Sequence, residues 1–340
     1  MVQNSPSVQI LIPTYNRSRF LYRAVTSSLS QSYQNLQVLI SDNHSSDSTP
    51  SVGQALERQH PGRVSYFRNR SNLGMTGNWI KLLKEYATAD YCLLLSDDDF
   101  FIDSSYIEEC VSKLLIAKER YSFSPSLVFG DLIVLQESDD AKHSKLVRFG
   151  WPEVITDRIL LRYWRKLCHG SFNHIPLCAC LFDRSIALKF SPFESPYLSA
   201  DFQLWWNMIL RSQPGIYIPK VSTAYVLHGA NEADRHKYSF ADFIRNYETY
   251  LQPFESYVKS LPPFDRLKSY FSLRRILSCS LRDNAGKDLG FLVYPFFAKV
   301  YHVSPRIFWY LLITFLLTPV VWLYIPLRRC KRFLVAFFAR

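Results

Sequence analysis

Three consecutive aspartates, Asp97, Asp98 and Asp99, are the most chemically distinctive feature of this 340-residue sequence. In an extended chain alternate side chains point the same way, so Asp97 and Asp99 could face one point while Asp98 faces elsewhere. Carboxylates that close repel each other and raise each other's pKa unless a cation lies between them. Oxygen ligands suit Mg²⁺ or Mn²⁺, which proteins commonly share with substrate phosphates. The triplet therefore favours a diphosphate held to the protein through a metal ion.

The elements around the triplet predict where it lies. Apolar runs predict four strands, at residues 8–12, 36–40, 64–67 and 91–95. Apolar residues at helical spacing predict the helices that follow them, within residues 20–29, 49–59, 79–86 and 107–115. This alternation predicts a doubly wound, mostly parallel α/β sheet with helices on both faces. Ligands bind such sheets outside the carboxyl ends of the strands, and the triplet directly follows the fourth strand. The alternative is a solvated loop in which one aspartate caps the next helix.

Polar residues follow each of the four predicted strands. They are Pro13-Thr14-Tyr15-Asn16, Ser41-Asp42-Asn43, the stretch from Arg68 to Gly74, and the aspartate triplet. No GxGxxG follows the first strand and no GxxxxGK[ST] occurs, which argues against a dinucleotide-binding fold and a P-loop. Carboxylates and amides converge on this edge instead.

Four segments, PTYNR, LISDNHSSDST, RNRSNLGMTGN and LLSDDD, resemble in this order the pattern of glycosyltransferase family 2 on a GT-A fold. The resemblance covers about residues 7–135 and thins out beyond them. It implies an inverting transferase that moves a sugar from a nucleotide-sugar donor and uses Mn²⁺ or Mg²⁺. Asn43 and His44 stand where the family more often has Asp and Gly, which leaves the preferred base open.

The resemblance also implies roles for single residues. Asp42 matches the acid that hydrogen-bonds the base, and Asp97 with Asp99 match the DxD motif that binds the ribose and the metal. His228, in AYVLHGANE, resembles a histidine that in some relatives is a third metal ligand, although a lone histidine is more often structural. The expected donor-binding residues are Pro13, Thr14, Tyr15, Asn16, Asp42, Asn72, Gly74, Asn78, Asp97 and Asp98, and the expected metal ligands are Asp97, Asp99 and His228.

Asp201 is the predicted catalytic base. Attack by an acceptor hydroxyl requires a carboxylate that takes its proton, and Asp201 begins a helical pattern of apolar residues beyond the triplet. Family members often carry Glu-Asp at a comparable position, whereas Ala200 precedes the aspartate here. Two alternatives stay open: Asp201 caps its helix, or Asp183, beside the strand-like run CACLF, is the base.

Charge and apolarity coincide in the last 82 residues. Residues 259–340 hold 14 Lys and Arg against 3 Asp and Glu, which accounts for the whole net charge of +11. The uncharged stretch 307–327 lies in this tail and is followed by Arg328, Arg329, Lys331 and Arg332. Pro319 divides the stretch, so we expect a re-entrant or interfacial helical segment with the basic cluster on anionic lipid. A buried core helix is the alternative. A nearly neutral remainder argues against nucleic acid as a partner.

These observations predict three parts: a nucleotide-sugar-binding half at 1–135, an acceptor-binding and catalytic half at 136–258, and the membrane-associating tail at 259–340. Seven cysteines without paired spacing and an N-terminus without a signal sequence favour the cytoplasmic face of a membrane. We expect a glycan or lipid-linked acceptor. The alternatives are a nucleotidyltransferase of sugar phosphates, disfavoured by the missing glycine-rich loop, and an inactive sugar-nucleotide-binding protein, disfavoured by the intact acids.

Overall fold

The computed structural model describes residues 5–137, 142–160, 175–190, 192–193, 200–228, 257 and 259. The chain divides into two compact units, residues 1–237 with 249–254 and residues 238–248 with 255–340. Every helix and strand named below belongs to the first unit.

The first four strands form a parallel sheet in the order β3-β2-β1-β4. They are β1 (Val8–Thr14), β2 (Leu36–Asp42), β3 (Val64–Arg68) and β4 (Tyr91–Leu94). Each begins where its apolar run begins, and β1 and β2 extend two residues further than predicted. Nearly continuous apolar runs suit parallel strands because helices cover both of their faces.

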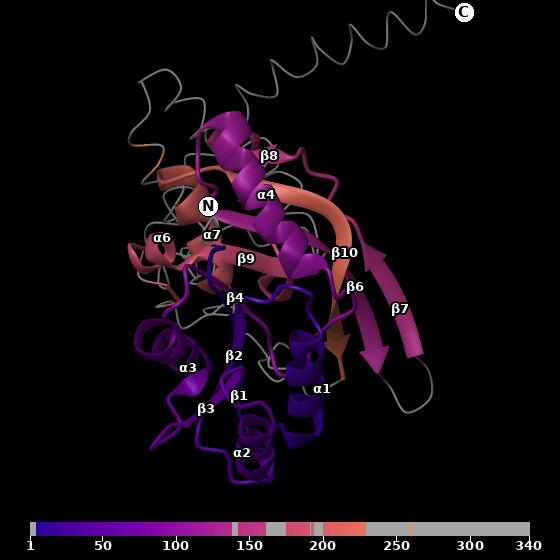
Figure 1. The fold of residues 1–340 in the computed structure, drawn as a ribbon. Helices are drawn as coiled ribbons and strands as arrows, with labels where there is room; N and C mark the ends of the chain where they lie inside the picture. The colour runs from indigo at the N-terminus through magenta and orange to yellow at the C-terminus, as the bar shows by residue number, and fades with distance from the viewer. Residues whose placement is uncertain are drawn as a thin grey trace, which may run out of the picture. The chain divides into compact units, whose positions relative to one another are not determined.

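Helices cover both faces of this parallel part (Figure 1). They are α1 (Ser18–Leu29), α2 (Thr49–Gln59) and α3 (Gly74–Lys81), which continues as the π-helical turn η1 (Leu82–Tyr86). Gly53 of α2 packs against the ring of Tyr66, while Asn78 of α3 hydrogen-bonds Ser41. Since successive strand residues point to opposite faces, Asp42 faces the side of α2 and Ser41 faces the side of α3.

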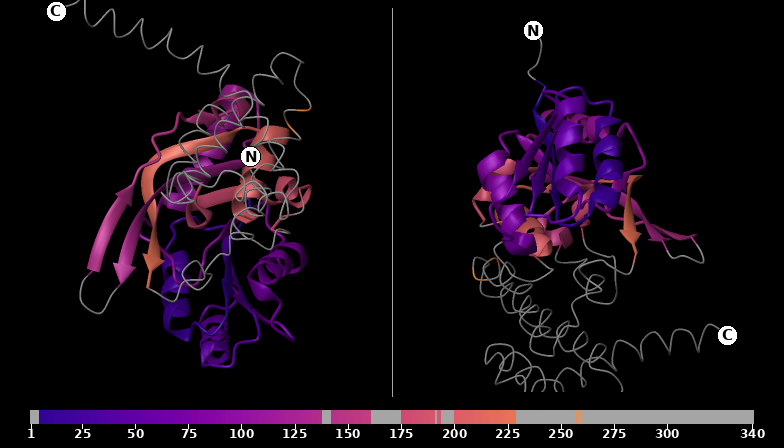
Figure 2. Two further views of the ribbon diagram at one scale, coloured as in Figure 1. Left: turned by 180° about the vertical axis from the view of Figure 1, so that it is seen from behind. Right: turned by 90° about the horizontal axis from the view of Figure 1, so that it is seen from below.

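Beyond β4 the sheet is mixed. The further elements are β5 (Phe100–Phe101), α4 (Tyr106–Tyr121), β6 (Leu127–Glu137), β7 (Lys142–Val147), β8 (Val154–Ile155), η2 (Leu177–Ala179), β9 (Cys180–Asp183), α6 (Arg184–Leu188), α7 (Ala200–Arg211) and β10 (Gly215–Leu227). The order continues β4-β9-β6-β10-β5, with β7 on β6 and β8 on β10. Seen from behind and from below, the long strands β6 and β10 lie beside the parallel strands (Figure 2).

The expectation of a mostly parallel sheet is therefore wrong for this second part. The short β9 lies between β4 and β6 and runs antiparallel to both, whereas β6 and β10 are parallel. Such pairings join residues far apart in the sequence, and local periodicity carries no information about them. Because the same sheet contains β1 and β10, the two predicted halves share one sheet, and their boundary stays a prediction.

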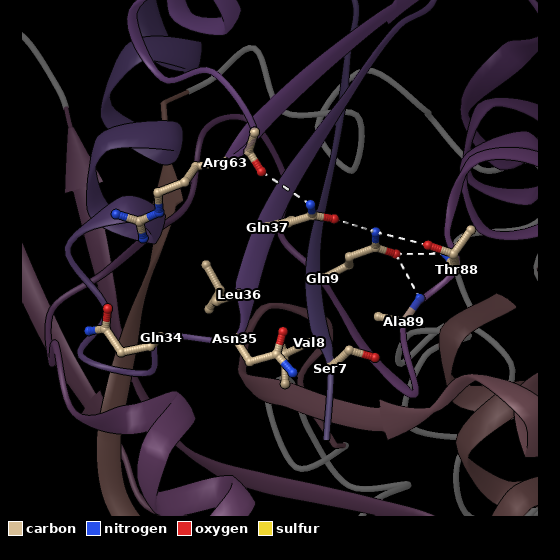
Figure 3. A pocket seen from close by; sticks show the side chains of 11 residues that line it. Ser7, Val8, Gln9, Gln34, Asn35, Leu36, Gln37, Arg63, Thr88 and Ala89 are labelled. Carbon is tan, nitrogen blue, oxygen red and sulfur yellow. Dashed lines mark hydrogen bonds between the residues drawn. The ribbon is translucent and has the colours of Figure 1, made fainter. Parts of the chain in front are cut away.

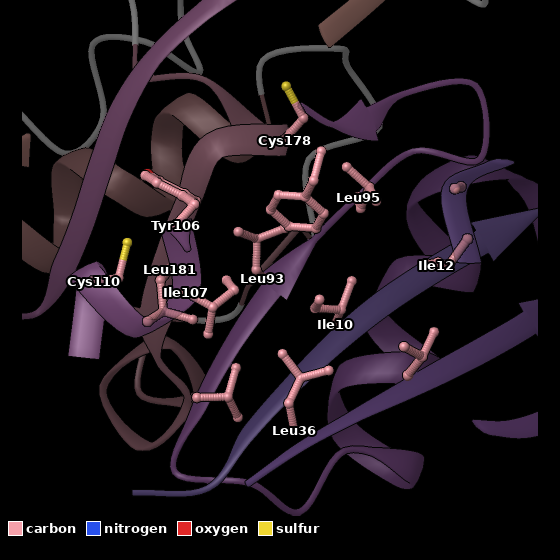
Figure 4. Close-up of a cluster of buried hydrophobic side chains, with 14 of the residues drawn as sticks. Ile10, Ile12, Leu36, Leu93, Leu95, Tyr106, Ile107, Cys110, Cys178 and Leu181 are labelled. Carbon is pink, nitrogen blue, oxygen red and sulfur yellow. The ribbon is translucent and has the colours of Figure 1, made fainter. Parts of the chain in front are cut away.

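A continuous apolar core lies on the face of the sheet that α1 and α4 cover (Figure 4). Ile10 and Ile12 of β1 lie in it beside Leu93 of β4 and Ile107 of α4, and each of these side chains is fully buried. Burial of one such side chain contributes about 1.5–3 kcal/mol. This core fixes the strands whose ends carry the polar residues.

The predicted membrane-associating tail lies outside the described residues, apart from Lys259. Within the described part of the chain, no helix combines the length and apolarity that crossing a bilayer requires.

Candidate functional site

The carboxyl ends of β1, β2 and β4 lie side by side. Thr14 at the end of β1 is in register with Asp42 at the end of β2, and Leu11 of β1 is in register with Leu94 of β4. The aspartate triplet follows β4 after two residues, so it lies at the same edge as Thr14 and Asp42. Asp97, Asp98 and Asp99 are only 7%, 8% and 2% exposed. Three buried acids thus lie at the edge where sheets of this kind bind ligands.

A turn, and not an extended strand, carries the triplet. The backbone N–H of Asp99 donates to the carbonyl of Ser96 at 3.1 Å, which closes a turn over residues 96–99. The strand alternation expected from the sequence therefore does not decide where these side chains point. Their individual partners decide it.

Asp97 is a buried carboxylate with an unmatched oxygen. In the described part of the chain, its Oδ2 and the neighbouring Thr14 Oγ1 are buried without a hydrogen-bond partner. Burial and the charge of Asp98 raise the pKa of Asp97 to about 7, although the charge of Arg17 and the backbone N–H of Tyr15 act in the opposite direction. The ionised form therefore lacks sufficient positive charge around it.

Asp99 is also a buried carboxylate with a raised pKa. Its Oδ1 accepts a hydrogen bond of 3.0 Å from the backbone N–H of Val226 on β10. Burial raises the pKa of Asp99 well above its ordinary value, and the charges of Asp98 and Asp97 add to the effect. A cation between Asp97 and Asp99 would offset both contributions.

Asp98, by contrast, is paired within the protein. Its Oδ2 lies 2.8 Å from Nη1 of Arg17 and 3.0 Å from Nε2 of His228. Its backbone carbonyl accepts a hydrogen bond of 3.0 Å from Nη2 of Arg23. The structure thus places Asp98, expected to bind the donor, in a contact between α1 and the end of β10.

His228 contacts the central aspartate of the triplet. Its ring also stacks on Phe20 of α1, with 4.6 Å between the ring centroids. Across the described ranges, no group of three His, Cys, Asp or Glu side chains is arranged to hold a metal ion. A metal role for Asp97, Asp99 and His228 stays a prediction, and substrate phosphates would have to complete such a site.

Asp42 is a fixed acceptor on the α2 side of the sheet. It is fully buried, and its Oδ1 accepts from the backbone N–H of Ser45 at 2.8 Å. Its Oδ2 accepts from the hydroxyl of Tyr66 at 2.5 Å. Burial, together with the hydrogen bond and charge of Asp42, raises the pKa of Tyr66. The hydroxyl stays protonated and holds the carboxylate in place.

Four asparagines form a network on the α3 side. Asn43 Nδ2 donates to Asn72 Oδ1 at 2.8 Å and to the carbonyl of Gly74 at 3.0 Å. Asn69 Nδ2 donates to Asn43 Oδ1 at 3.2 Å and to Asn78 Oδ1 at 2.9 Å. Gly74 has φ +74°, a conformation that glycine adopts readily. The expected donor-binding residues Asn72, Gly74 and Asn78 are thus brought together, with Asn78 buried as an internal partner.

Asn78 fastens this network to the sheet. Its Oδ1 accepts from Ser41 Oγ at 2.6 Å, and its Nδ2 donates to the carbonyl of Ser41 at 3.0 Å. The loop after β3 is therefore held to the end of β2 by side-chain amides and not by charge.

The loop after β1 joins the same edge. Pro13 is buried in register with Ser41, whereas Tyr15 is 42% exposed. Asn16 adopts φ +53°, and its Oδ1 accepts from the backbone N–H of Ser46 at 2.8 Å. This bond ties the loop after β1 to the loop after β2.

Asp201 lies in the first turn of α7 and is 7% exposed. Its charge adds to burial in raising the pKa of Cys180, just as Asp99 and burial raise the pKa of Cys178. Asp201 and Asp99 are therefore both close to the short segment formed by η2 and β9.

Asp183, the rival base, lies elsewhere. Its Oδ1 accepts from the backbone N–H of Ile186 at 2.9 Å and so caps α6. It is in register with Tyr91, the first residue of β4, which places it at the opposite edge of the sheet from Asp97. The expectation of Asp183 as an alternative base at this site is wrong.

The sequence alone does not indicate several side chains that hold the site together, namely Arg17, Tyr66 and Asn69. Arg17 lies within the PTYNR segment, but nothing in its spacing indicates a contact with Asp98, 81 positions away. Asn69 and Tyr66 likewise carry no local signal, because their partners come from other strands.

A hollow at the amino ends of the strands is a separate feature (Figure 3). Its side chains include Gln9 and Gln37, joined by a hydrogen bond of 3.1 Å, and its charged residue is Arg63. It lies at the other edge of the sheet from the aspartates and lacks carboxylates.

Comparison with known proteins shows that the chain is similar to glycosyltransferases. Residues 9–123 match the family model for glycosyl transferase family 2. The GalNAc(5)-diNAcBac-PP-undecaprenol beta-1,3-glucosyltransferase of Campylobacter jejuni is 31% identical over 138 residues, 40% of this chain and 41% of that protein. The chain thus covers less than half of that relative's length. The UDP-Glc:alpha-D-GlcNAc-diphosphoundecaprenol beta-1,3-glucosyltransferase WfaP of Escherichia coli is 24% identical over 232 residues, 68% of this chain and 81% of that protein.

Among solved structures, Staphylococcus aureus TarS (residues 1–349) in complex with UDP-GlcNAc has a TM-score of 0.58 at 12% identity, covering 81% of this chain and 73% of that one. At this identity the likeness concerns the fold alone. It confirms the expected α/β class with a GT-A-like sheet.

Proposed function

We propose that the chain is a member of glycosyl transferase family 2, whose model matches residues 9–123, and that it transfers a sugar from a nucleotide-sugar donor to an acceptor hydroxyl. One observation carries the proposal: the buried, unmatched Oδ2 of Asp97 at the carboxyl edge of the sheet, beside Asp99, whose pKa burial also raises. A soluble domain without a ligand at this edge would gain stability by replacing such carboxylates. Their presence supports binding of a cation together with a charged substrate.

The side chains fit a divalent ion. Asp97 and Asp99 offer hard oxygen ligands, and burial together with the charge of Asp98 raises the pKa of both. When bound there, Mn²⁺ or Mg²⁺ would offset the negative charge that grows on a departing nucleoside diphosphate. Asp97 and Asp99 would hold it, with the diphosphate oxygens as further ligands.

The rest of the edge would bind and orient the donor. Asp42, fixed by Ser45 and Tyr66, is a rigid acceptor for an N–H group of the base. The loop that contains Asn72 and Gly74, held by Asn43, would border the ribose and sugar. Tyr15, exposed on the loop after β1, offers a ring face for stacking. A uridine nucleotide is the proposed donor nucleotide, because the name of WfaP contains UDP-Glc.

Asp201 is the proposed base. A carboxylate at the start of α7, close to the same η2–β9 segment as Asp99, is suited to accept the proton of an acceptor hydroxyl as it attacks. Attack from the side opposite the diphosphate would invert the configuration of the sugar carbon. The acceptor is proposed to be a polyprenyl-diphosphate-linked glycan, because two relatives carry undecaprenol diphosphate acceptors in their names.

The test is transfer with purified protein. A panel of nucleotide sugars is incubated with Mn²⁺ and a short polyprenyl-diphosphate sugar, and release of nucleoside diphosphate is measured with product mass. We expect turnover with a UDP-sugar, loss of it in chelator, and loss in Asp99→Asn. Glu119→Gln, which removes an exposed acid of α4, is the matched control. Full turnover in chelator would refute metal dependence, and no turnover with any donor would refute the transferase.

Membrane association is proposed on composition. The uncharged stretch 307–327 and the basic residues after it would place the chain on the anionic cytoplasmic face of a membrane. Cosedimentation with anionic vesicles is expected for the full chain and not after deletion of residues 303–340. Equal cosedimentation of both proteins would contradict this role.

A further inference from the structure

Arg17 connects three elements that are far apart in the sequence. Its Nη1 lies 2.8 Å from Asp98 Oδ2 and 3.0 Å from His228 Nε2. The side chains of Arg17, Asp98 and His228 are only 13%, 10% and 7% exposed. Phe20, on the first turn of α1, stacks on the ring of His228. The start of α1 therefore holds both the centre of the aspartate triplet and the end of β10.

A second arginine of the same helix fixes the backbone at this point. Arg23 Nη2 donates to the carbonyl of Asp98, and its guanidinium lies 4.4 Å from the centre of the Phe100 ring. Asp98 is thus held through both its carboxylate and its carbonyl. Such a residue has little freedom to turn toward a substrate.

The three aspartates differ in how their charges are compensated. Asp98 has a short ion pair with Arg17, whereas Asp97 has an unmatched oxygen and Asp99 a single backbone donor in the described part of the chain. A guanidinium cannot lose its proton in a protein, so its charge stays beside Asp98 at every working pH.

We propose that Arg17 and Asp98 are a positioning pair: Arg17 neutralises Asp98, so that the net charge offered to a metal and a nucleoside diphosphate is that of Asp97 and Asp99. The inference rests on the proposed function for its substrate and goes beyond it in assigning Asp98 a role different from that of its two neighbours. Arg17 then acts through Asp98 and not by contact with the donor.

If Arg17 and Asp98 form such a pair, the two single variants should change the Mn²⁺ affinity in opposite directions. Arg17→Gln removes a positive charge from beside Asp98, which makes the surroundings of the cation site more negative, so Mn²⁺ should bind more tightly while turnover falls because the ion is drawn away from its place. Asp98→Asn removes a negative charge from beside the cation site, so Mn²⁺ should bind more weakly. The double variant removes both charges and should return near the wild-type affinity. A residue with only a packing role would not produce opposite shifts.

The experiment is a calorimetric titration of UDP at a series of Mn²⁺ concentrations into the full chain. Because these charges are partly buried, we expect the apparent Mn²⁺ affinity to rise about tenfold in Arg17→Gln and to fall about tenfold in Asp98→Asn. Arg17→Lys keeps the charge and should stay within about threefold of wild type. Arg19→Gln, which removes an exposed arginine of the same helix, is the matched control.

Several results overturn the inference. Shifts in the same direction for Arg17→Gln and Asp98→Asn would reduce the pair to a packing role. Weaker UDP binding by Arg17→Gln in the absence of Mn²⁺ would place Arg17 on the diphosphate. If wild-type protein binds UDP without any Mn²⁺ dependence, the metal part of the proposed function fails, and thermal unfolding of the same four proteins then decides the pair. A double variant that loses less stability than the two single losses together supports it, and additive losses contradict it.

Discussion

The two sides of the strand edge use different chemistry. On the α3 side, four asparagines and Ser41 are joined by neutral hydrogen bonds, as Asn78 is with Ser41 and Asn69, although the buried Asn69 Oδ1 has no partner among the described residues. On the β4 side, three buried aspartates share two arginines, and Asp97 and Asp99 have raised pKa values. Both sides follow parallel strands of one sheet, so the difference lies in the side chains and not in the backbone.

This difference indicates a division of labour. A neutral network of amides holds a loop in one conformation and costs less to bury than charged groups do. An acidic cluster that is incomplete without a cation costs stability and gains from binding. The amide side would therefore shape the site, and the acidic side would supply the affinity for metal and diphosphate. The predictions for Asp99 and Asn78 below each break one side and leave the other intact, and those for Asp201 and Gly53 test residues outside both.

The largest effect is expected for Asp99→Asn. Loss of this carboxylate should lower kcat/KM about a thousandfold because charge stabilisation on the leaving diphosphate is lost. Thermal stability should be unchanged or higher, since a buried, poorly compensated charge is removed while Val226 keeps an acceptor. Initial rates and melting temperature, compared with Glu119→Gln, provide the measurement. An active Asp99→Asn enzyme would contradict the assignment.

Asp201→Asn tests the proposed catalytic base, which belongs to neither the α3 side nor the β4 side of the strand edge. Loss of a general base should lower kcat roughly a hundredfold or more while KM for the donor changes little. Steady-state kinetics at varied donor concentration measure kcat and KM separately. Should Asp201 only cap α7, the variant would keep both kcat and stability, since asparagine is itself a good cap.

Breaking the amide side should cost stability first. Asn78→Ala leaves Ser41 and Asn69 without a buried partner, so the free energy of unfolding should fall by about 2–3 kcal/mol. Urea unfolding measures it, with the exposed Gln34→Ala as control. Donor KM should rise because the loop of Gly74 loses its anchor. An unchanged unfolding free energy would show that the network does not hold this loop.

A smaller effect is expected at the support of Asp42. A Cβ at position 53 would overlap the ring of Tyr66, so Gly53→Ala should displace that ring and weaken its bond to Asp42, at a cost of about 1–2 kcal/mol. Ser51→Ala on the same helix is exposed and serves as control. Equal melting temperatures for the two variants would mean that Tyr66 adapts without loss.

The sequence predicts the acidic side better than the amide side. Continuous apolar runs predict the parallel strands, and the end of each strand brings Asp42 and the triplet to one edge without further information. The amide contacts depend on tertiary placement: Asn69 and Asn43 meet only because β2 and β3 are neighbours in register. A lone asparagine in a loop gives no signal of such a partner.

The second half of the sheet escaped prediction for a related reason. The run at Cys180 correctly predicts the strand β9, but its antiparallel place between β4 and β6 follows from long-range pairing. The pairing of His228 with Asp98, across 130 positions, has the same origin. Local patterns predict elements, and only the packed sheet decides which of them meet.

The most direct test of the central claim is thermal stability against pH, with and without Mn²⁺ and UDP. Asp97 and Asp99 have raised pKa values in the folded state, so the folded protein binds more protons than the unfolded chain. Their contribution to stability should therefore decrease as pH rises from about 4, the ordinary aspartate value, toward about 7, the raised value of Asp97. Asp97→Asn and Asp99→Asn should flatten this decrease, and Mn²⁺ with UDP should restore wild-type stability at pH 8. A wild-type profile that neither variant nor ligand changes would contradict the account of this edge as an anionic site completed by a cation and a nucleoside diphosphate.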